Sequence, residues 1–256
     1  MHKTKGIFIT WTPASTRASS LAESLGFETF FFGKKLRHKT IFHSLFTYFG
    51  KARSNIRVVR KHKPGVIAVT NTQWIIALLN LILARVYGAR LVFDSHSAAF
   101  DHPFIKYPRF LTYYFARKAF VSIVTNRAHK ELLERKGARA TIITDIPYEH
   151  VLFMKERKKL NEKFNLCFVC TYGNDEPYLD VFDSVQQMDD VLLHVTGNYK
   201  NKNIDTERYN NIRFTGFLSS GEYRELINQV DAIMVLTTRE NTMQRGGSEA
   251  ISVGNP

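Results

Sequence analysis

The chain of 256 residues is 44% apolar and 13% aromatic, which excludes an intrinsically disordered protein and provides for one large or two medium cores. The net charge of +13 comes wholly from residues 1–150, which contain 24 Lys and Arg against 8 Asp and Glu; residues 151–256 contain 12 against 15. Only two cysteines are present and no secretory signal is visible, so we expect a reducing, cytoplasmic location.

The first 150 residues alternate short β-branched runs with longer helical stretches, which is the pattern of a parallel sheet with crossover helices. Gly26, Gly88 and Gly137 stand where helix C-caps are expected. Strands are predicted at 6–11, 28–33, 65–70, 89–94, 121–126 and 140–145, and helices near 16–26, 40–62, 73–87, 108–119 and 127–136. The pattern predicts one complete doubly wound, Rossmann-like domain over residues 1–150.

The longest apolar stretch, residues 72–88, is interrupted by Asn80 and stops short of the roughly 20 residues that span a bilayer. We therefore expect a buried helix of the α/β layer there, and no membrane span.

The helix predicted at 40–62 is strongly basic and begins with aromatic residues, which favours an anionic membrane surface as its partner. Its residues of interest are Lys51, Arg53, Arg57, Arg60, Lys61 and Lys63, beside Phe46, Tyr48 and Phe49. A solvated basic helix face is an equal alternative. Nucleic acid is a third, but we expect no nucleic-acid partner because no binding module for it is found.

Residues 151–164 are charged and lack a strand pattern, so we interpret them as an interdomain linker. The alternation then resumes, with strands predicted at 165–173, 191–197, 211–216 and 232–238 and helices near 178–187, 219–229 and 246–253. These elements predict a second Rossmann-like domain over residues 165–256. Because the next strand of the series does not follow, we expect this domain to be incomplete and the chain to be a fragment.

Cys167 and Cys170 have the spacing of a zinc or redox motif. However, the surrounding sequence predicts a buried strand, in which residues three apart point to opposite faces, and no second cysteine pair could complete a zinc site. We interpret both as structural.

The strongest candidate site is the stretch from residue 237 to 256. Gly246 and Gly247 open a predicted helix, so its backbone could approach a phosphate closely, and Arg245 adds a positive charge. Glu249, in the expected first helical turn, could accept hydrogen bonds from a ribose diol. The alternative is an ordinary capped helix, because Ser248 and Glu249 also suit a helix start.

At this point the sequence resembles the GT-B glycosyltransferases of the family 4-like group. Residues 246–256, GGSEAISVGNP, are similar to the family's E-A-x-x-x-G-x-P signature. In the expected order, DEP follows the first strand of the second domain (175–177), VTGN the second (195–198), and FTGFL with the nearby Tyr223 the third (214–218). The resemblance implies two doubly wound domains facing a cleft, with a nucleotide-sugar donor in the second.

The resemblance also implies residue roles on the donor side. Glu249 would bind the ribose, and Gly246 and Gly247 would lie near the diphosphate. Glu240 would contact the donor sugar or serve catalysis, although eight residues separate it from Glu249 where the family has seven. Lys200 or Lys202 would be a second cationic partner of the diphosphate, and the strand-end residues Gly173, Thr196 and Gly197 are expected beside the donor. The family is typically metal-independent, and no D-x-D motif argues otherwise, so we expect no metal and no other cofactor.

In the first domain, Asp94 and His96 follow a predicted strand, on the side where ligands bind doubly wound sheets. His96 could hydrogen-bond the transferred sugar or the acceptor, and Asp94 could orient it or act as a base. The alternatives are a turn cap for Asp94 and a satisfied loop histidine for His96. Arg17 could meet an anionic acceptor, or be a surface residue of a helix start.

The sequence therefore predicts a glycosyltransferase that moves a hexosyl unit from a nucleotide sugar to a lipid-linked or nascent glycan acceptor, with retention favoured over inversion. It would act at a membrane surface in the synthesis of a cell-surface polysaccharide. The alternatives are a GT-B sugar-nucleotide epimerase or phosphorylase, and a non-catalytic polyanion-binding protein.

Overall fold

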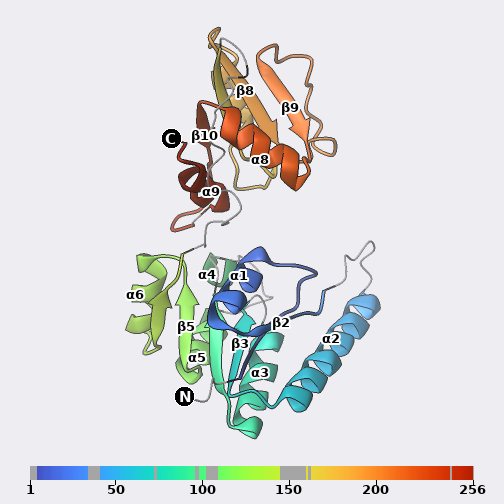
Figure 1. Ribbon diagram of the computed structural model, residues 1–256, viewed down its shortest axis with the longest axis vertical. Coiled ribbons are helices and arrows are strands. Elements are labelled where there is room, and N and C mark those ends of the chain that lie inside the picture. The colour runs from blue at the N-terminus through green and yellow to red at the C-terminus, as the bar shows by residue number, and fades with distance from the viewer. Residues whose placement is uncertain are drawn as a thin grey trace. The chain divides into compact units, whose positions relative to one another are not determined.

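The computed structural model describes residues 5–33, 41–71, 74–95, 98–101, 109–144, 160, 163–242 and 244–255. The chain forms two compact units, Met1–Ile146 and Pro147–Pro256, which we call the N-terminal and C-terminal units (Figure 1). Of the predicted linker at 151–164, only residues 160, 163 and 164 are described, so its role stays a prediction.

The N-terminal unit is built on a six-stranded parallel sheet with the strand order β2-β1-β3-β4-β5-β6. The strands are β1 (Gly6–Thr10), β2 (Glu28–Phe31), β3 (Val66–Thr70), β4 (Arg90–Asp94), β5 (Val121–Val124) and β6 (Ala140–Ile142). The helices are α1 (Thr16–Leu25), α2 (Ile41–His62), α3 (Trp74–Tyr87), α4 (Ala98–Asp101), α5 (Arg109–Lys118) and α6 (Arg127–Arg135). Every strand predicted for this domain is confirmed, and among its described residues only the one-turn helix α4 was not predicted.

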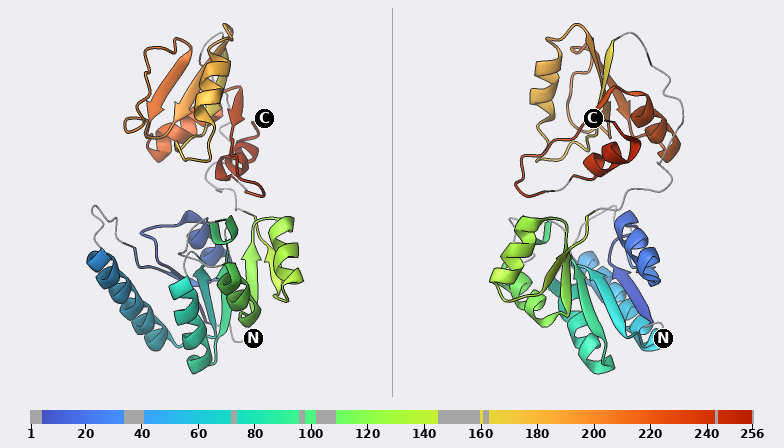
Figure 2. Two further views of the ribbon diagram at one scale, coloured as in Figure 1. Left: turned by 180° about the vertical axis from the view of Figure 1, so that it is seen from behind. Right: turned by 60° about the vertical axis from the view of Figure 1, so that its left-hand side comes forward.

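Helices cover both faces of this sheet (Figure 2). As a consequence, every residue of β1 is buried. Ile7 and Ile9 point to the face covered by α2, α3 and α5, whereas Phe8 points to α1. Successive side chains of a strand alternate between faces, so an unbroken apolar run is what a central parallel strand requires. This arrangement confirms the doubly wound interpretation.

Local signals in the sequence explain where the helices begin and end. The Ser15 side chain caps α1 and the Asn126 side chain caps α6, each by accepting a hydrogen bond from a backbone N–H three residues later. Gly26, Gly88 and Gly137 all have positive φ, between 65° and 78°, as expected for residues that end helices.

The predicted buried helix at 73–87 is α3, and it is buried on one side only. Ile76, Ala77 and Leu81 lie in the core, but Ile82 and Val86 are exposed. The predicted helix of the α/β layer is therefore present, but only the face of α3 that meets the sheet is buried. No helix among the described residues is both long and apolar enough to cross a bilayer.

The C-terminal unit contains a four-stranded parallel sheet in the order β10-β7-β8-β9. The strands are β7 (Phe164–Phe168), β8 (Val191–Thr196), β9 (Ile212–Gly216) and β10 (Ala232–Met234), and the helices are α7 (Tyr178–Val185), α8 (Ser220–Gln229) and α9 (Arg245–Val253). All seven predicted elements are confirmed. However, β7 and β10 end earlier than expected, and the residues beyond their ends form loops that contact each other.

The two cysteines are buried, as predicted. Cys167 packs with Ile227 on one face of the sheet, and Cys170 packs with Phe168 on the other. Both thiols are free, and burial raises the pKa of each to about 12, so they remain protonated and unreactive at neutral pH. The described residues contain no group of three or more His, Cys, Asp and Glu side chains that could hold a metal ion.

His194 gives the C-terminal unit a testable pH dependence. Its Nε2 lies 3.1 Å from Asn165 Oδ1 in the core, and burial, with a contribution from the Arg213 charge, lowers its pKa from 6.5 to about 4. Between these two pH values the unfolded chain binds a proton that the folded chain does not. The stability of the folded state should therefore decrease as the pH falls from 6.5 to 4.

Urea denaturation at a series of pH values tests this prediction. His194→Gln, which keeps an amide donor for Asn165, should show a weaker loss of stability over this range than the wild type. An identical slope in the two proteins would contradict the assignment.

Candidate functional site

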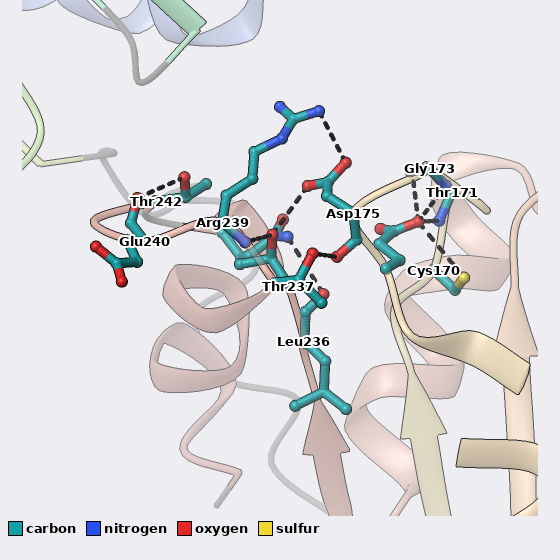
Figure 3. A network of polar contacts seen from close by, with 12 residues as sticks. Cys170, Thr171, Gly173, Asp175, Leu236, Thr237, Arg239, Glu240 and Thr242 are labelled. Carbon is teal, nitrogen blue, oxygen red and sulfur yellow. Dashed lines mark hydrogen bonds and ion pairs between the residues drawn. The ribbon is translucent and has the colours of Figure 1, made fainter. Parts of the chain in front are cut away.

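Two loops of the C-terminal unit meet at the carboxyl ends of β7 and β10 (Figure 3). We call residues 169–177 the β7–α7 loop and residues 235–244 the β10–α9 loop. Asp175 joins them. Its Oδ2 accepts a hydrogen bond from Thr237 Oγ1 (2.9 Å), and its Oδ1 pairs with Arg239 Nη2 (3.0 Å). Its backbone carbonyl accepts from the Thr238 N–H (2.7 Å). The contacts fix the beginning of the β10–α9 loop.

Glu176, the next residue, contacts the β7–α7 loop to which it belongs, and not the β10–α9 loop. Its Oε2 accepts from the backbone N–H of Thr171 (2.9 Å), from the Thr171 hydroxyl (3.0 Å) and from the backbone N–H of Gly173 (2.7 Å). Tyr172 between them has a left-handed φ of 57°, so the N–H groups on either side converge into an anion-binding nest. The N–H of Gly173, predicted for the donor, is thus occupied by a carboxylate of the chain itself.

Thr196 and Gly197, at the end of β8, lie against the same loop. The Thr196 hydroxyl is buried and accepts from the Cys170 N–H (3.1 Å). Gly197 has a φ of 91°, and a Cβ there would stand 2.2 Å from the Cys170 carbonyl oxygen, so no other residue fits. The structure therefore brings Gly173, Thr196 and Gly197 together: Thr196 and Gly197 bond to backbone groups, and Gly173 bonds to the Glu176 carboxylate.

The two predicted lysines differ in their surroundings. Lys200 is exposed. Lys202 is half-buried, and its positive charge opposes part of the rise that burial causes in the pKa of Cys170. Lys202 is thus the lysine that lies close to the β7–α7 loop.

The start of α9 holds four of the predicted donor residues, Arg245, Gly246, Gly247 and Glu249. The helix begins at Arg245, so Glu249 lies in the second turn and not, as expected, in the first. Its N-cap residue, Gln244, makes no side-chain capping bond, which also contradicts the alternative of a helix start capped through Ser248 and Glu249. Ser248 is buried within the helix instead.

The Glu249 carboxylate is held at both oxygens. Arg245 Nε donates to its Oε1 (2.9 Å), and the Tyr223 hydroxyl of α8 donates to its Oε2 (2.6 Å). The Glu249 side chain is only 12% exposed. Burial, followed by the Glu249 contact, raises the pKa of Tyr223 far above its usual range, so the hydroxyl remains a donor at every pH of interest.

Glu240 is set apart from this cluster. It lies in the exposed part of the β10–α9 loop, where its backbone carbonyl accepts from Thr242 Oγ1 (3.3 Å). Its carboxylate points away from Asp175 (Figure 3).

In the N-terminal unit, Arg17 and Asp94 form a buried ion pair. Arg17 Nε lies 3.0 Å from Asp94 Oδ1, and its Nη2 donates to the Ile143 carbonyl (2.7 Å). The two side chains are 7% and 1% exposed, so the alternative of Arg17 as a surface residue was wrong. The pair links α1 to the ends of β4 and β6. His96 lies outside the described residues.

The basic helix α2 exposes most of its predicted cations, including Arg53, Arg57, Arg60 and Lys61. Lys51 is the exception. Its Nζ donates to the Trp11 carbonyl (2.9 Å) and lies 5.7 Å from the centre of the Tyr48 ring, so it belongs to the helix–sheet interface.

No protein-family model matches the sequence, and no curated protein matches it. Solved structures do. HepE of Anabaena, in complex with UDP and glucose, is 14% identical with a TM-score of 0.70; the match covers 99% of this chain and 79% of that chain. The chain has the GT-B fold. Two further GT-B structures support this conclusion.

The lipopolysaccharide outer core galactosyltransferase WaaB is 14% identical with a TM-score of 0.66, over 98% of this chain and 79% of that one. The UDP-GlcNAc 2-epimerase of Methanocaldococcus jannaschii is 12% identical with a TM-score of 0.58, over 98% and 82%. At such identities the similarity establishes the GT-B fold, and function has to be argued from the site.

Sequence analysis missed the contacts that organise the site. Asp175, Glu176 and Tyr223 entered it only through their resemblance to family motifs. The sequence does not indicate which loop a carboxylate at the end of a strand will contact in the folded chain. Arg17 and Asp94 were considered separately because 77 positions divide them.

The two glycines of α9 should respond differently to a Cβ. At Gly246 it would stand 3.0 Å from Val235 Cγ2 and 3.1 Å from Val169 Cβ, whereas at Gly247 no heavy atom lies within 4 Å. We expect Gly246→Ala to destabilise the protein by about 1–3 kcal/mol through overpacking. Gly247→Ala should be neutral or stabilise it by up to about 1 kcal/mol, because alanine favours helix. Denaturant titration measures both, and equal losses would contradict this packing.

Proposed function

We propose that the protein is a glycosyltransferase that moves a hexosyl unit from a nucleoside-diphosphate sugar to a lipid-linked or nascent glycan acceptor. The transfer would proceed with retention, in the synthesis of a cell-surface polysaccharide or glycoconjugate. The observation that carries the proposal is the start of α9. A Cβ at Gly247 would meet no heavy atom within 4 Å, and Gly247 stands in the sequence between Arg245 and Glu249, whose side chains are paired.

Three features of this helix start suit a diphosphate. No side chain caps its first turn, and the helix dipole favours an anion at this end. Arg245 supplies a full positive charge beside it. The Ser248 hydroxyl is buried and has no hydrogen-bond partner among the described residues, so a bound phosphate could supply one.

Glu249 suits the ribose of the same nucleotide. A carboxylate can accept hydrogen bonds from both hydroxyls of a diol, and Tyr223 already holds it in place through one oxygen. We propose that the ribose replaces Arg245 at the other oxygen, which releases the guanidinium toward the diphosphate.

The charges at this site also motivate the proposal that donor binding needs no metal. Arg245, Lys202 and the start of α9 together could stabilise the departing nucleoside diphosphate, as cations and dipoles do in other transferases. Binding should therefore be the same in EDTA and in Mg²⁺.

Glu240 and His96 remain the proposed catalytic residues, and for Asp94 we propose the role of orienting His96. The exposed Glu240 would contact the donor sugar, and His96 the sugar or the acceptor. Because Asp94 is paired with Arg17, we propose that this pair positions the residues that follow β4. In that role Arg17 would act on the acceptor side indirectly.

Binding of UDP, GDP and ADP, measured by calorimetry, tests the proposal. We expect at least one to bind, and Glu249→Ala to weaken it about 10- to 100-fold, because hydrogen bonds to a charged group are lost. Tyr223→Phe should weaken it about tenfold by releasing Glu249. Neither variant should affect binding of the matching 2′,3′-dideoxy nucleotide as strongly.

Tyr209→Phe is the matched control, since it also removes a hydroxyl that contacts a carboxylate, that of Asp183, in the same unit. It should bind nucleotide like the wild type. If none of the three nucleotides binds, the proposed function is wrong. If one binds and Glu249→Ala leaves its affinity unchanged, only the ribose assignment is wrong.

The charge of the N-terminal unit motivates a peripheral location at an anionic, cytoplasmic membrane surface, where a lipid-linked acceptor would be found. The exposed Arg53, Arg57 and Arg60 of α2 would attract such a surface. Binding to vesicles that contain phosphatidylglycerol should then weaken as salt rises. Binding that is indifferent to both lipid charge and salt would contradict this part of the proposal.

Two alternatives have support of their own. The similarity to a UDP-GlcNAc 2-epimerase favours an enzyme that acts on a nucleotide sugar without an acceptor; such an enzyme would convert a nucleotide sugar into its C2 epimer in the absence of any glycan. A phosphorylase shares the fold but requires a lysine-held cofactor. The basic N-terminal unit favours a polyanion-binding protein, which would bind heparin in a salt-dependent way and no nucleoside diphosphate.

A further inference from the structure

The outer side of α3 is an exposed apolar stripe. Trp74, Leu78, Ile82 and Val86 follow one another at intervals of four residues, and each is at least 36% exposed; Val86 reaches 70%. Side chains four residues apart lie on the same face of a helix. The core-facing side of α3 is also apolar and already packs against the sheet. The stripe on the outer side therefore takes no part in that packing.

The helices on either side of α3 extend this stripe. Helix α3 contacts both α2 and α5, and all three pack on one face of the sheet. Phe46, Phe49 and Ile56 of α2 are exposed, with Phe46 at 77%. Phe110 and Tyr114 of α5 are exposed as well, with Phe110 at 69%. We call these five side chains, together with the four of the stripe, the apolar face.

The charged side chains of these three helices are basic, although His62 at the end of α2 lies 3.3 Å from the Glu28 carboxylate of β2. None of the three helices contains an Asp or a Glu. Exposed arginines of α2 flank its apolar residues. At the carboxyl ends of α3 and α5 a pocket of about 390 Å³ is lined by Arg85, Arg90, Lys118 and Arg139, together with Phe120. An apolar surface of this kind, bordered by cations and containing aromatic rings, suits the boundary between lipid headgroups and acyl chains.

We propose that the apolar face inserts into the surface of an anionic bilayer, with the arginines of α2 and of the pocket among the headgroups. The inference deepens the membrane part of the proposed function: the contact is apolar insertion on α3 and its neighbours, in addition to attraction by α2. A second copy of the chain fits the face less well, because its arginines would meet those of its partner.

Vesicle co-sedimentation at 0.1 M and 0.5 M NaCl tests the inference on the whole chain. Salt screens surface charges but not apolar burial, so binding to phosphatidylglycerol-containing vesicles should fall at high salt and yet remain measurable. Ile82→Asn and Val86→Asn together should weaken the remaining binding at least about tenfold. Leu25→Asn is the matched control: Leu25 is an equally exposed leucine on α1, which covers the other face of the sheet.

Each outcome has a definite meaning. Because the substituted side chains are exposed, the melting temperature should stay that of the wild type, and tryptophan fluorescence of Trp74 should shift to the blue on vesicle binding. Binding that disappears at 0.5 M NaCl and is unchanged by the two substitutions would overturn apolar insertion, while leaving electrostatic attraction intact. A concentration-dependent dimer that the same substitutions dissociate would assign the face to a second copy instead.

Discussion

The contacts of Asp175 are the constraint on which the candidate nucleotide site depends. Thr237, Thr238 and Arg239 reach this one residue, so the β10–α9 loop leaves its strand in a fixed direction. That direction brings α9 back over β7 and β10, closely enough that Gly246 packs on Val169 and Val235. Because the strands are parallel, both loops lie at one edge of the sheet. The bonds of Asp175 then fix the position of one loop relative to the other.

At the same edge the chain pairs several of its polar groups with one another. Glu176 fills a nest of backbone N–H groups, and Arg245 pairs with the carboxylate proposed for the ribose. Buried or partly buried polar groups need partners, and at these two places other groups of the chain supply them. Nucleotide binding at α9 would then be an exchange of partners.

Sequence analysis predicted the fold well, because period-2 and helical patterns, together with capping residues such as Ser15 and Asn126, are local signals. It placed Gly246, Gly247 and Glu249 on the correct helix. It did not predict contacts between residues that are far apart in the sequence. These are the buried ion pair of Arg17 with Asp94, the hydrogen bond from Tyr223 to Glu249, and the hydrogen bond from Lys51 to the Trp11 carbonyl. The exposed side of α3 was missed because an apolar helix gives the same pattern whether one or both of its faces are buried.

We propose that a nucleoside diphosphate binds at the start of α9. A crystal structure of the chain with a bound nucleoside diphosphate tests it most directly. We expect the diphosphate beside Gly247 and Arg245, the ribose hydroxyls on Glu249 Oε1, and Tyr223 still bonded to Oε2. A nucleotide bound elsewhere in the chain, with the Arg245–Glu249 pair intact, would contradict it.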